Sequence, residues 1–124
     1  RLAALTGEPM WQETANRQFE FLAAEFEQYP LGCSFGGLAM MDVLYPQKEL
    51  VCTSKDGLPA ELADYLRRSA DVHVLFKTEE NADALAQCAP FTKDYPVPEQ
   101  GTMYYLCENG SCKRPVQSFA ELNL

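Results

Sequence analysis

Basic residues and histidine are scarce in this chain of 124 residues. Ten Lys and Arg residues stand against eighteen Asp and Glu residues, and with a single histidine the formal net charge is −8. The basic side chains are scattered, and only Arg67–Arg68 and Lys113–Arg114 form adjacent pairs. Because nucleic-acid phosphates demand a basic surface, the composition argues against a nucleic-acid partner.

Long apolar runs are also missing. No run approaches the roughly 20 residues that a helix needs to span a bilayer, and no charged segment followed by an apolar one opens the sequence. We therefore expect no membrane association and a cytoplasmic location.

The sequence also lacks a recognisable set of catalytic residues. One histidine leaves few choices for a general base, and no residue stands on the sharp strand-to-helix turn typical of a hydrolase nucleophile. We therefore predict neither a cofactor nor an enzyme activity carried by this segment alone. The acidic residues fall on expected outer helix faces, where they complement helix N-termini: Glu61, Asp64, Glu79, Glu80 and Asp83.

The composition of the chain is typical of a globular protein. Apolar residues make up 47% of it and aromatic residues 11%, and a compact domain of this length buries roughly two-thirds of the surface of its unfolded chain. No metal or disulfide is needed merely to hold such a domain together. The five cysteines are odd in number and three lie inside apolar segments, which argues against a secreted disulfide framework.

Helical patterns fill the first third of the chain. The opening "RLAALTG" predicts the last turns of a helix that Gly7 ends, and Pro9 begins a second helix that runs to about Gln28. Pro30 separates this helix from a third, for which Ser34 is the predicted N-cap. Apolar residues of the second helix recur at steps of three and four on one face: Trp11, Ala15, Phe19, Leu22, Phe26 and Tyr29.

Two glycines, Gly36 and Gly37, lie in the first turn of the third helix. They allow either a close approach to a neighbouring helix or a late helix start, and the sequence does not separate these alternatives. Pro46 closes the third helix and marks the best internal boundary of the chain.

Short apolar strands and helices alternate after this boundary. Thr78 is the predicted N-cap of one helix, and Ser118 and Glu121 form a predicted capping box at the last. The expected elements are strands at 49–54, 71–77 and 103–107, helices at 59–69 and 79–88, an irregular loop at 89–101 and a short helix at 118–122.

This alternation is typical of parallel βαβ units, which place helices over the sheet. We therefore predict an α/β fold in which an N-terminal helical hairpin packs beside a small, mostly parallel sheet. The sheet is expected to end in a β-hairpin followed by a short C-terminal helix. The change of pattern divides the chain into residues 1–45 and residues 46–124.

One pair of cysteines is close in sequence, in the stretch "MYYLCENGSCKRPV". A two-residue turn at Asn109–Gly110 would be of type I′ and would set Cys107 opposite Cys112. The two residues then form a non-hydrogen-bonded pair whose Cα atoms lie roughly 4.5 Å apart. This separation is near the short end of the range that a disulfide accepts, where strain raises the reduction potential.

Three interpretations of the Cys107 and Cys112 pair stay open. The two residues could be reduced thiols packed at the sheet edge. They could instead form a labile disulfide used in redox chemistry, or belong to a metal site. Metal is the least favoured, because a structural zinc site wants four ligands and the lone His73 falls within an apolar strand. We predict no metal site.

A second, weaker candidate is the turn "TSKDG" after the first strand. Open α/β sheets bind ligands at the carboxyl ends of strands, so Ser54, Lys55 and Gly57 could hold an anion there. The spacing matches neither the dinucleotide fingerprint nor the P-loop. An ordinary solvated turn is the favoured alternative.

Several stretches together resemble the C-terminal region of the YyaL-type, spermatogenesis-associated family of thioredoxin-domain-containing proteins. They are "RLAALTGEPMWQETA", "YPLGCSFGGLAMMD", "ELVCTS", and "YYLCENGSCKRPV" followed by "SFAEL", in an order that covers nearly all of the chain. The family's Cys-x4-Cys hairpin maps onto Cys107 and Cys112, followed by Pro115 and Val116. One departure is that relatives tend to have a glycine directly after the first strand.

The resemblance implies that the chain is a piece of a longer protein. In that protein a thioredoxin-like domain precedes an (α/α) toroid similar to those of sugar epimerases and glycosidases. Residues 1–45 would be the last helices of the toroid, and residues 46–124 a small α/β C-terminal domain. The partner of the segment would be the rest of its own chain.

Three functions follow as hypotheses. The first is a non-catalytic structural or interaction domain of a larger thioredoxin-domain-containing protein. The second is an accessory redox module in which Cys107 and Cys112 exchange electrons with the thioredoxin-like domain. The third is a wall of a carbohydrate-active cavity in the toroid.

Overall fold

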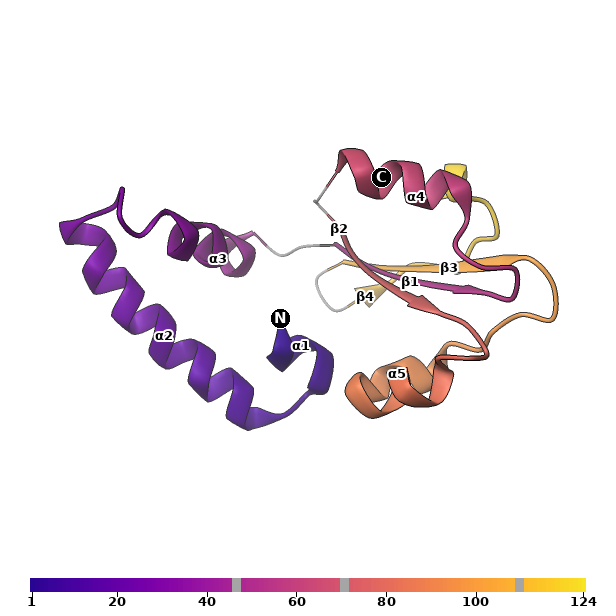
Figure 1. Ribbon diagram of the computed structural model, residues 1–124, viewed down its shortest axis with the longest axis horizontal. Coiled ribbons are helices and arrows are strands. Elements are labelled where there is room, and N and C mark those ends of the chain that lie inside the picture. The colour runs from indigo at the N-terminus through magenta and orange to yellow at the C-terminus, as the bar shows by residue number, and fades with distance from the viewer. Residues whose placement is uncertain (46–47, 70–71, 109–110) are drawn as a thin grey trace. The chain divides into compact units, whose positions relative to one another are not determined.

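The fold is seen in a computed structural model that describes residues 1–45, 48–69, 72–108 and 111–124 (Figure 1). The chain divides into two compact units, Arg1–Pro46 and Gln47–Leu124. The expected helix stop at Pro46 and the expected turn at Asn109–Gly110 lie outside the described residues. Within the described ranges, no helix is both long enough and apolar enough to cross a membrane.

The first unit contains three helices, α1 (Leu2–Thr6), α2 (Pro9–Gln28) and α3 (Ser34–Leu44). Gly7 ends α1 with a left-handed φ of 71°, and Pro9 occupies the first turn of α2, as predicted. Ser34 was expected as an N-cap but is the first residue of α3. The Cys33 carbonyl already accepts from the Gly37 amide at 2.8 Å, so helical bonding begins one residue earlier.

The glycine pair lies where α3 approaches α2. A Cβ atom at Gly36 would sit 2.7 Å from Leu22 Cδ2, and one at Gly37 would sit 2.9 Å from Phe26 Cε2. Both separations are shorter than real Cβ contacts, so the absence of side chains permits the close packing of the two helices. The structure thus favours close approach over a late helix start.

The three helices leave a large apolar surface uncovered. Within the described residues, none of the residues in α1, α2 or α3 is buried. The predicted apolar face of α2 is half-buried as far as Leu22 and exposed at Phe26 and Tyr29. Large apolar side chains are exposed in all three helices and their connections: Leu2, Met10, Phe21, Phe26, Tyr29, Leu31, Phe35, Leu38, Met41, Val43, Leu44 and Tyr45.

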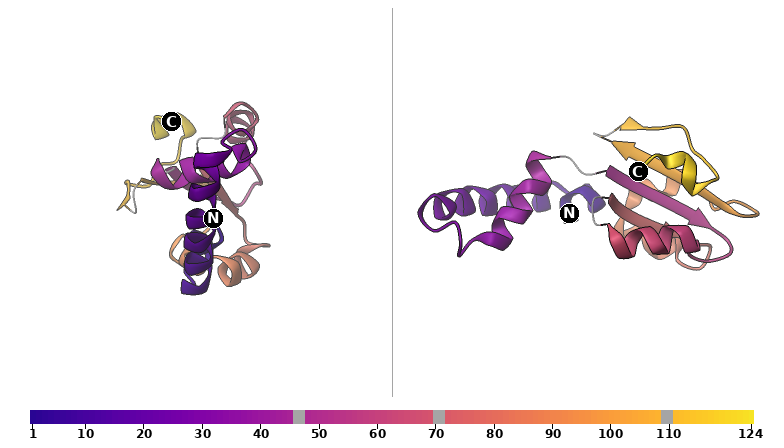
Figure 2. Two further views of the ribbon diagram at one scale, coloured as in Figure 1. Left: turned by 90° about the vertical axis from the view of Figure 1, so that its left-hand side faces the viewer. Right: turned by 90° about the horizontal axis from the view of Figure 1, so that it is seen from above.

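The second unit is an α/β layer structure, and the predicted fold class is confirmed. Its strands are β1 (Lys48–Ser54), β2 (Val72–Lys77), β3 (Thr102–Glu108) and β4 (Ser111–Cys112), in the order β2-β1-β3-β4. The right-hand view of Figure 2 follows this order across the sheet. The helices are α4 (Ala60–Arg68) and α5 (Ala82–Cys88), with 3-10 helices η1 (Pro90–Asp94) and η2 (Phe119–Leu122).

The sheet is mixed rather than mostly parallel, which corrects one detail of the prediction. β1 pairs with β2 in parallel, but β3 runs antiparallel to both β1 and β4. The seven residues of α5 span only about 10 Å, less than the roughly 23 Å of a seven-residue strand. The rest of the connection, through η1 and residues 95–101, brings the chain back to the end of the sheet where β2 stops, so β3 runs opposite to β1.

Two predicted caps take a different form. Asn81, not Thr78, is the N-cap of α5, although the Thr78 side chain accepts from the Asn81 amide at 3.3 Å. At η2 the Glu121 amide bonds the Ser118 carbonyl at 3.2 Å, and Ser118 makes no side-chain cap. A 3-10 helix satisfies this amide through the backbone, so the capping box does not form.

The two faces of the sheet carry different layers. α4 and η2 cover one face and α5 the other (Figure 1). Side chains alternate between the faces along each strand, so the Cys107 face is distinct from the main core. That core lies under α4 and η2 and consists of Leu50, Cys52, Leu62, Val72, Tyr104, Leu106 and Leu122.

Candidate functional site

The site lies at the β3–β4 hairpin, where Cys107 and Cys112 are register partners. The Lys113 amide donates to the Leu106 carbonyl at 2.8 Å, so the neighbouring cysteine pair is the non-hydrogen-bonded kind. The two sulfurs form a disulfide, and the Cα atoms are 3.9 Å apart. Of the three interpretations that the sequence left open, the structure contains the bonded pair.

The two sulfur-bearing residues differ in access to solvent. Cys107 is 8% exposed, because it lies within β3 on a covered face, whereas Cys112 is exposed in the two-residue strand β4. Cys112 is therefore the member of the pair that lies open to solvent.

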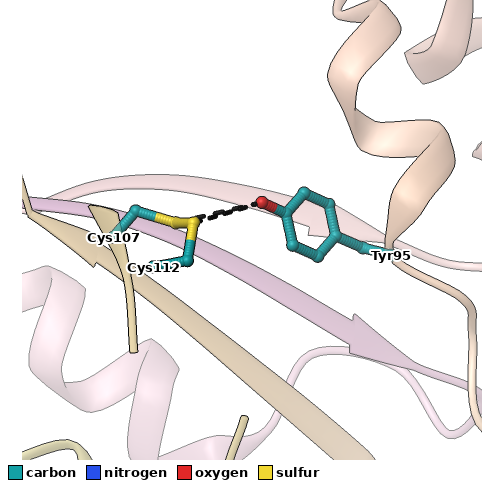
Figure 3. Close-up of a disulfide and its surroundings, with 3 residues drawn as sticks. All are labelled: Tyr95, Cys107 and Cys112. Carbon is teal, nitrogen blue, oxygen red and sulfur yellow. Dashed lines mark hydrogen bonds between the residues drawn. A yellow bond between two sulfur atoms is a disulfide. The ribbon is translucent and has the colours of Figure 1, made fainter. Parts of the chain in front are cut away.

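Tyr95 brings a hydroxyl group to this disulfide from the segment after η1. Its Oη atom lies 3.4 Å from the Cys112 sulfur and 3.9 Å from the Cys107 sulfur (Figure 3). The ring packs edge-on against Tyr105 with centroids 4.7 Å apart, and against Phe91 at 6.3 Å. These contacts direct the phenol along the sheet toward the sulfurs.

A buried ammonium group holds the segment that carries Tyr95. Lys77, at the end of β2, is 6% exposed, and its Nζ donates to the carbonyls of Thr92 at 2.7 Å and Tyr95 at 2.8 Å. Thr92 is itself buried and donates from Oγ1 to the Ala89 carbonyl at 2.8 Å. The backbone at Tyr95 is therefore anchored to the sheet.

Sequence reasoning missed both Tyr95 and Lys77. Lys77 ends an apolar strand, where a lysine ordinarily reaches solvent, and Tyr95 stands in a proline-rich loop that was expected to be irregular. The helical turn of η1 within this loop is what brings the two residues together. No local pattern in the sequence indicates this contact.

A charged group flanks the hairpin. The Glu108 carboxylate lies 3.1 Å from Lys113 Nζ and 3.6 Å from Lys48 Nζ. The hydrogen bond from Lys113 is the largest cause that lowers the pKa of Glu108, and the positive charges of both lysines add to it. The carboxylate therefore ties β1, β3 and the end of β4 together by charge.

Three further cysteines are free: Cys33, Cys52 and Cys88. Burial raises the pKa of the Cys52 thiol to about 12, so this thiol stays protonated and unreactive. Cys33 is half-buried and Cys88 is exposed. Neither belongs to the hairpin.

The predicted anion-binding turn is held by its own internal bonds. Ser54 is buried, and its Oγ donates to the Gly101 carbonyl at 3.4 Å. The same oxygen accepts from the Asp56 amide at 3.3 Å and from Thr102 Oγ1 at 3.1 Å. The Ser54 hydroxyl therefore serves the loop.

The other two residues of that turn are Lys55 and Gly57. Lys55 Nζ lies 3.9 Å from the Glu79 carboxylate, and Gly57 adopts a φ of 91° that a side chain would strain. Anion binding at this turn stays a prediction.

Metal ligation has no assembled site in the parts of the chain that the structure describes, since no three His, Cys, Asp or Glu side chains there could hold an ion together. His73 on β2 is the register partner of Glu49 on β1, and Glu49 is in turn the register partner of Cys107 on β3. The His73 Nε2 atom is buried and has no hydrogen-bond partner among the described residues.

Comparison of the chain with protein-family models, curated proteins and solved structures gave no match.

Proposed function

We propose that the β3–β4 hairpin is a thiol–disulfide exchange element, in which Cys107 and Cys112 alternate between a disulfide and two thiols. The observation that carries the proposal is a disulfide with one solvent-exposed residue, Cys112, and a tyrosine hydroxyl beside both sulfurs. A purely structural crosslink would gain nothing from an exposed end. It would also close only a short loop, since the two cysteines are five residues apart.

The exchange is an ordinary two-step reduction. A thiolate of the reductant attacks the Cys112 sulfur, a new sulfur–sulfur bond forms, and the old bond breaks with its electron pair on Cys107. The second thiol of the reductant then attacks the mixed disulfide and releases Cys112. The hairpin gains two electrons and two protons, and the reductant becomes a disulfide.

The expected location supports this use of the pair. In the cytoplasm, glutathione and thioredoxin keep most thiols reduced, so a disulfide there is usually transient and catalytic or redox-sensing. We propose a cytoplasmic location on the composition alone. A hairpin pair that cycles between its two states suits such a compartment.

The resemblance suggests the electron donor. Proteins of the thioredoxin-domain-containing family carry a thioredoxin-like domain, and a dithiol of that kind is a suitable reductant for an exposed disulfide. We propose that this domain, as part of the same longer chain, is the partner of the hairpin.

Electron transfer from a dithiol protein tests the proposal. Oxidised chain, with Cys33→Ser and Cys88→Ser to remove other reactive thiols, is mixed with reduced thioredoxin under native conditions. We expect two new thiols per chain and an equal loss of thioredoxin thiols. The matched Cys107→Ser/Cys112→Ser chain should oxidise no thioredoxin, and a native wild-type pair that stays oxidised would refute the proposal.

A structural or interaction role for the first unit is a second candidate. It is favoured by the apolar side chains that α1, α2 and α3 leave exposed, since helices with such faces normally pack against further helices. The resemblance suggests that those helices belong to a toroid of the same longer chain. The carbohydrate-cavity hypothesis rests on the resemblance alone.

A further inference from the structure

The Tyr95 hydroxyl lies within hydrogen-bond reach of both sulfurs, and the Tyr95 backbone is fixed by a buried lysine. We infer that Tyr95 is a catalytic residue of the exchange, which donates a hydrogen bond to the Cys107 thiolate when the disulfide opens at Cys112. Lys77 is the positioning residue that holds it there. This inference rests on the proposed exchange function. It adds a catalytic residue and specifies that Cys112 is attacked while Cys107 leaves as the thiolate.

The need for a donor follows from burial. When a thiolate attacks Cys112, the electron pair of the broken bond goes to the Cys107 sulfur, which lies in a largely covered site. A negative charge in such a place loses its hydration and is costly without a hydrogen-bond donor. Among the described residues, Tyr95 provides the one side-chain hydroxyl in contact with Cys107.

The chemistry of a phenol suits this role. A phenol is in general a weaker acid than a thiol, so a phenol hydroxyl can donate a hydrogen bond to a thiolate. The proton that finally converts Cys107 to a thiol comes from solvent. Hydrogen bonds to ionised groups are stronger than neutral ones, so the contact strengthens as negative charge develops on the sulfur.

The position of the hydroxyl depends on Lys77. The ammonium bonds the carbonyl of Tyr95 itself and that of Thr92, three residues earlier. Both bonds fix the backbone from which the ring extends, and the edge-on contact with Tyr105 fixes the ring. The hydroxyl is therefore in place before the reaction begins.

The other titratable groups on this face of the sheet either disfavour a negative charge on Cys107 or lie further from Cys107 than its register partner does. Glu49 is the register partner of Cys107 on β1, and its carboxylate opposes a second negative charge. His73 is one strand further away, on β2. Tyr105 precedes Cys107 on β3, and burial raises the pKa of its hydroxyl. A donor at Tyr95 offsets the effect of Glu49.

The decisive experiment isolates Cys107. In a chain with Cys33→Ser, Cys88→Ser and Cys112→Ser, the pH at which Cys107 ionises is read from the ultraviolet absorbance of the thiolate. Adding Tyr95→Phe should shift the thiol–thiolate ratio about tenfold toward the thiol, the usual effect of one hydrogen bond to an ionised group. Tyr104→Phe, which removes a hydroxyl from the opposite face of β3, is the matched control and should leave the ratio unchanged.

The intact disulfide gives a second readout. In the chain that keeps Cys107 and Cys112, Tyr95→Phe should slow reduction by dithiothreitol about three- to tenfold, because a poorer leaving thiolate leaves more slowly. Glu49→Gln should act in the opposite direction on both readouts.

Outcomes distinguish this inference from the proposed function. If the wild-type pair accepts electrons but Tyr95→Phe changes neither the ionisation of Cys107 nor the reduction rate, the role of Tyr95 is refuted and the exchange function stands. If the wild-type pair cannot be reduced in the native protein, the exchange function itself fails.

Lys77 variants test the positioning role. Lys77→Arg can still donate to both carbonyls and should keep the ionisation of Cys107 near that of the parent chain. Lys77→Met should shift it as Tyr95→Phe does, provided that its near-ultraviolet circular dichroism shows a folded chain. A folded Lys77→Met chain with unchanged ionisation would refute the positioning role, and if it does not fold, Lys77→Arg and Tyr95→Phe decide.

Discussion

Lys77 places an ammonium group inside the second unit, where the partners of its Nζ are the carbonyls of Thr92 and Tyr95. A buried charge is tolerated when hydrogen bonds replace its hydration. The same two bonds keep the loop after α5 against the sheet. The stability of this loop and the position of the Tyr95 backbone beside the disulfide therefore depend on Lys77.

Replacing this lysine should destabilise the protein markedly. Lys77→Met leaves two carbonyl groups without their donor, and we expect a loss of about 2–4 kcal/mol in the free energy of unfolding. Chemical denaturation measures it. Lys55→Met, at an exposed lysine in a loose ion pair, is the matched control and should change stability by less than about 0.5 kcal/mol. Equal effects of the two variants would contradict the role given to Lys77.

Glu108 should make the hairpin sensitive to acid. Its pKa is lowered in the folded protein, chiefly by the hydrogen bond from Lys113, so its contribution is fully present above the ordinary glutamate pKa. That contribution is lost as the pH falls through the lowered value. The unfolding midpoint of the wild type should therefore exceed that of Glu108→Gln near neutral pH and converge with it in acid. A difference that persists in acid would contradict this account.

Residue-scale prediction from sequence succeeded where contacts were local. Cys107 and Cys112 meet because a short hairpin leaves them no other arrangement, and the sequence predicted that proximity. Tyr95 and Lys77 meet only because a 3-10 helix folds the intervening loop back, and no local pattern indicates this. The Ser118 cap failed for a similar reason, since the helix it was to begin is of the 3-10 kind.

Among the elements, α4 has one buried side chain, Leu62, and a second, Tyr65, packs partly buried against the same core. Leu62 is 0% exposed in the main core, whereas Leu66, one turn later, is 39% exposed. We expect Leu62→Ala to cost about 2–5 kcal/mol of unfolding free energy, through lost burial and the cavity left behind. The same change at Leu66 should cost much less, and denaturant titration compares the two. Similar losses would mean that α4 packs differently.

Element prediction from sequence was accurate for type and weaker for direction. The apolar periodicity and the two prolines gave α2 its bounds, and the strands lie close to the expected ranges. The direction of β3 depends on the whole connection over residues 78–101. A connection of this length can enter the next strand in either direction, and no local pattern within it indicates which end of the sheet the chain meets again.

At the scale of the molecule, the two units differ in what stabilises them. The second unit has a continuous core beneath α4 and η2, whereas the helices of the first bury none of their described residues. We therefore expect residues 47–124 alone to unfold cooperatively on heating. Residues 1–46 alone should show no cooperative transition. Circular dichroism of both fragments checks this, and a non-cooperative 47–124 fragment would contradict it.

At the scale of the whole molecule, the sequence predicts the division into two units but not what packs against the first unit. Composition and alternation indicate an α/β layer and a separate set of helices, because both depend on local periodicity. What covers the apolar side chains of the first unit depends on surfaces that do not belong to those three helices. The family resemblance offers a toroid as that cover, and this stays a proposal.

Opening of the disulfide at Cys112 is the step on which both the exchange function and the role of Tyr95 depend. The direct measurement is to trap the mixed disulfide between the oxidised chain, carrying Cys33→Ser and Cys88→Ser, and a thioredoxin whose resolving cysteine is replaced. Mass spectrometry of the digested adduct identifies the bonded cysteine. We predict an adduct at Cys112 with Cys107 released as a free thiol. An adduct at Cys107, or no adduct with the native chain, would contradict the account.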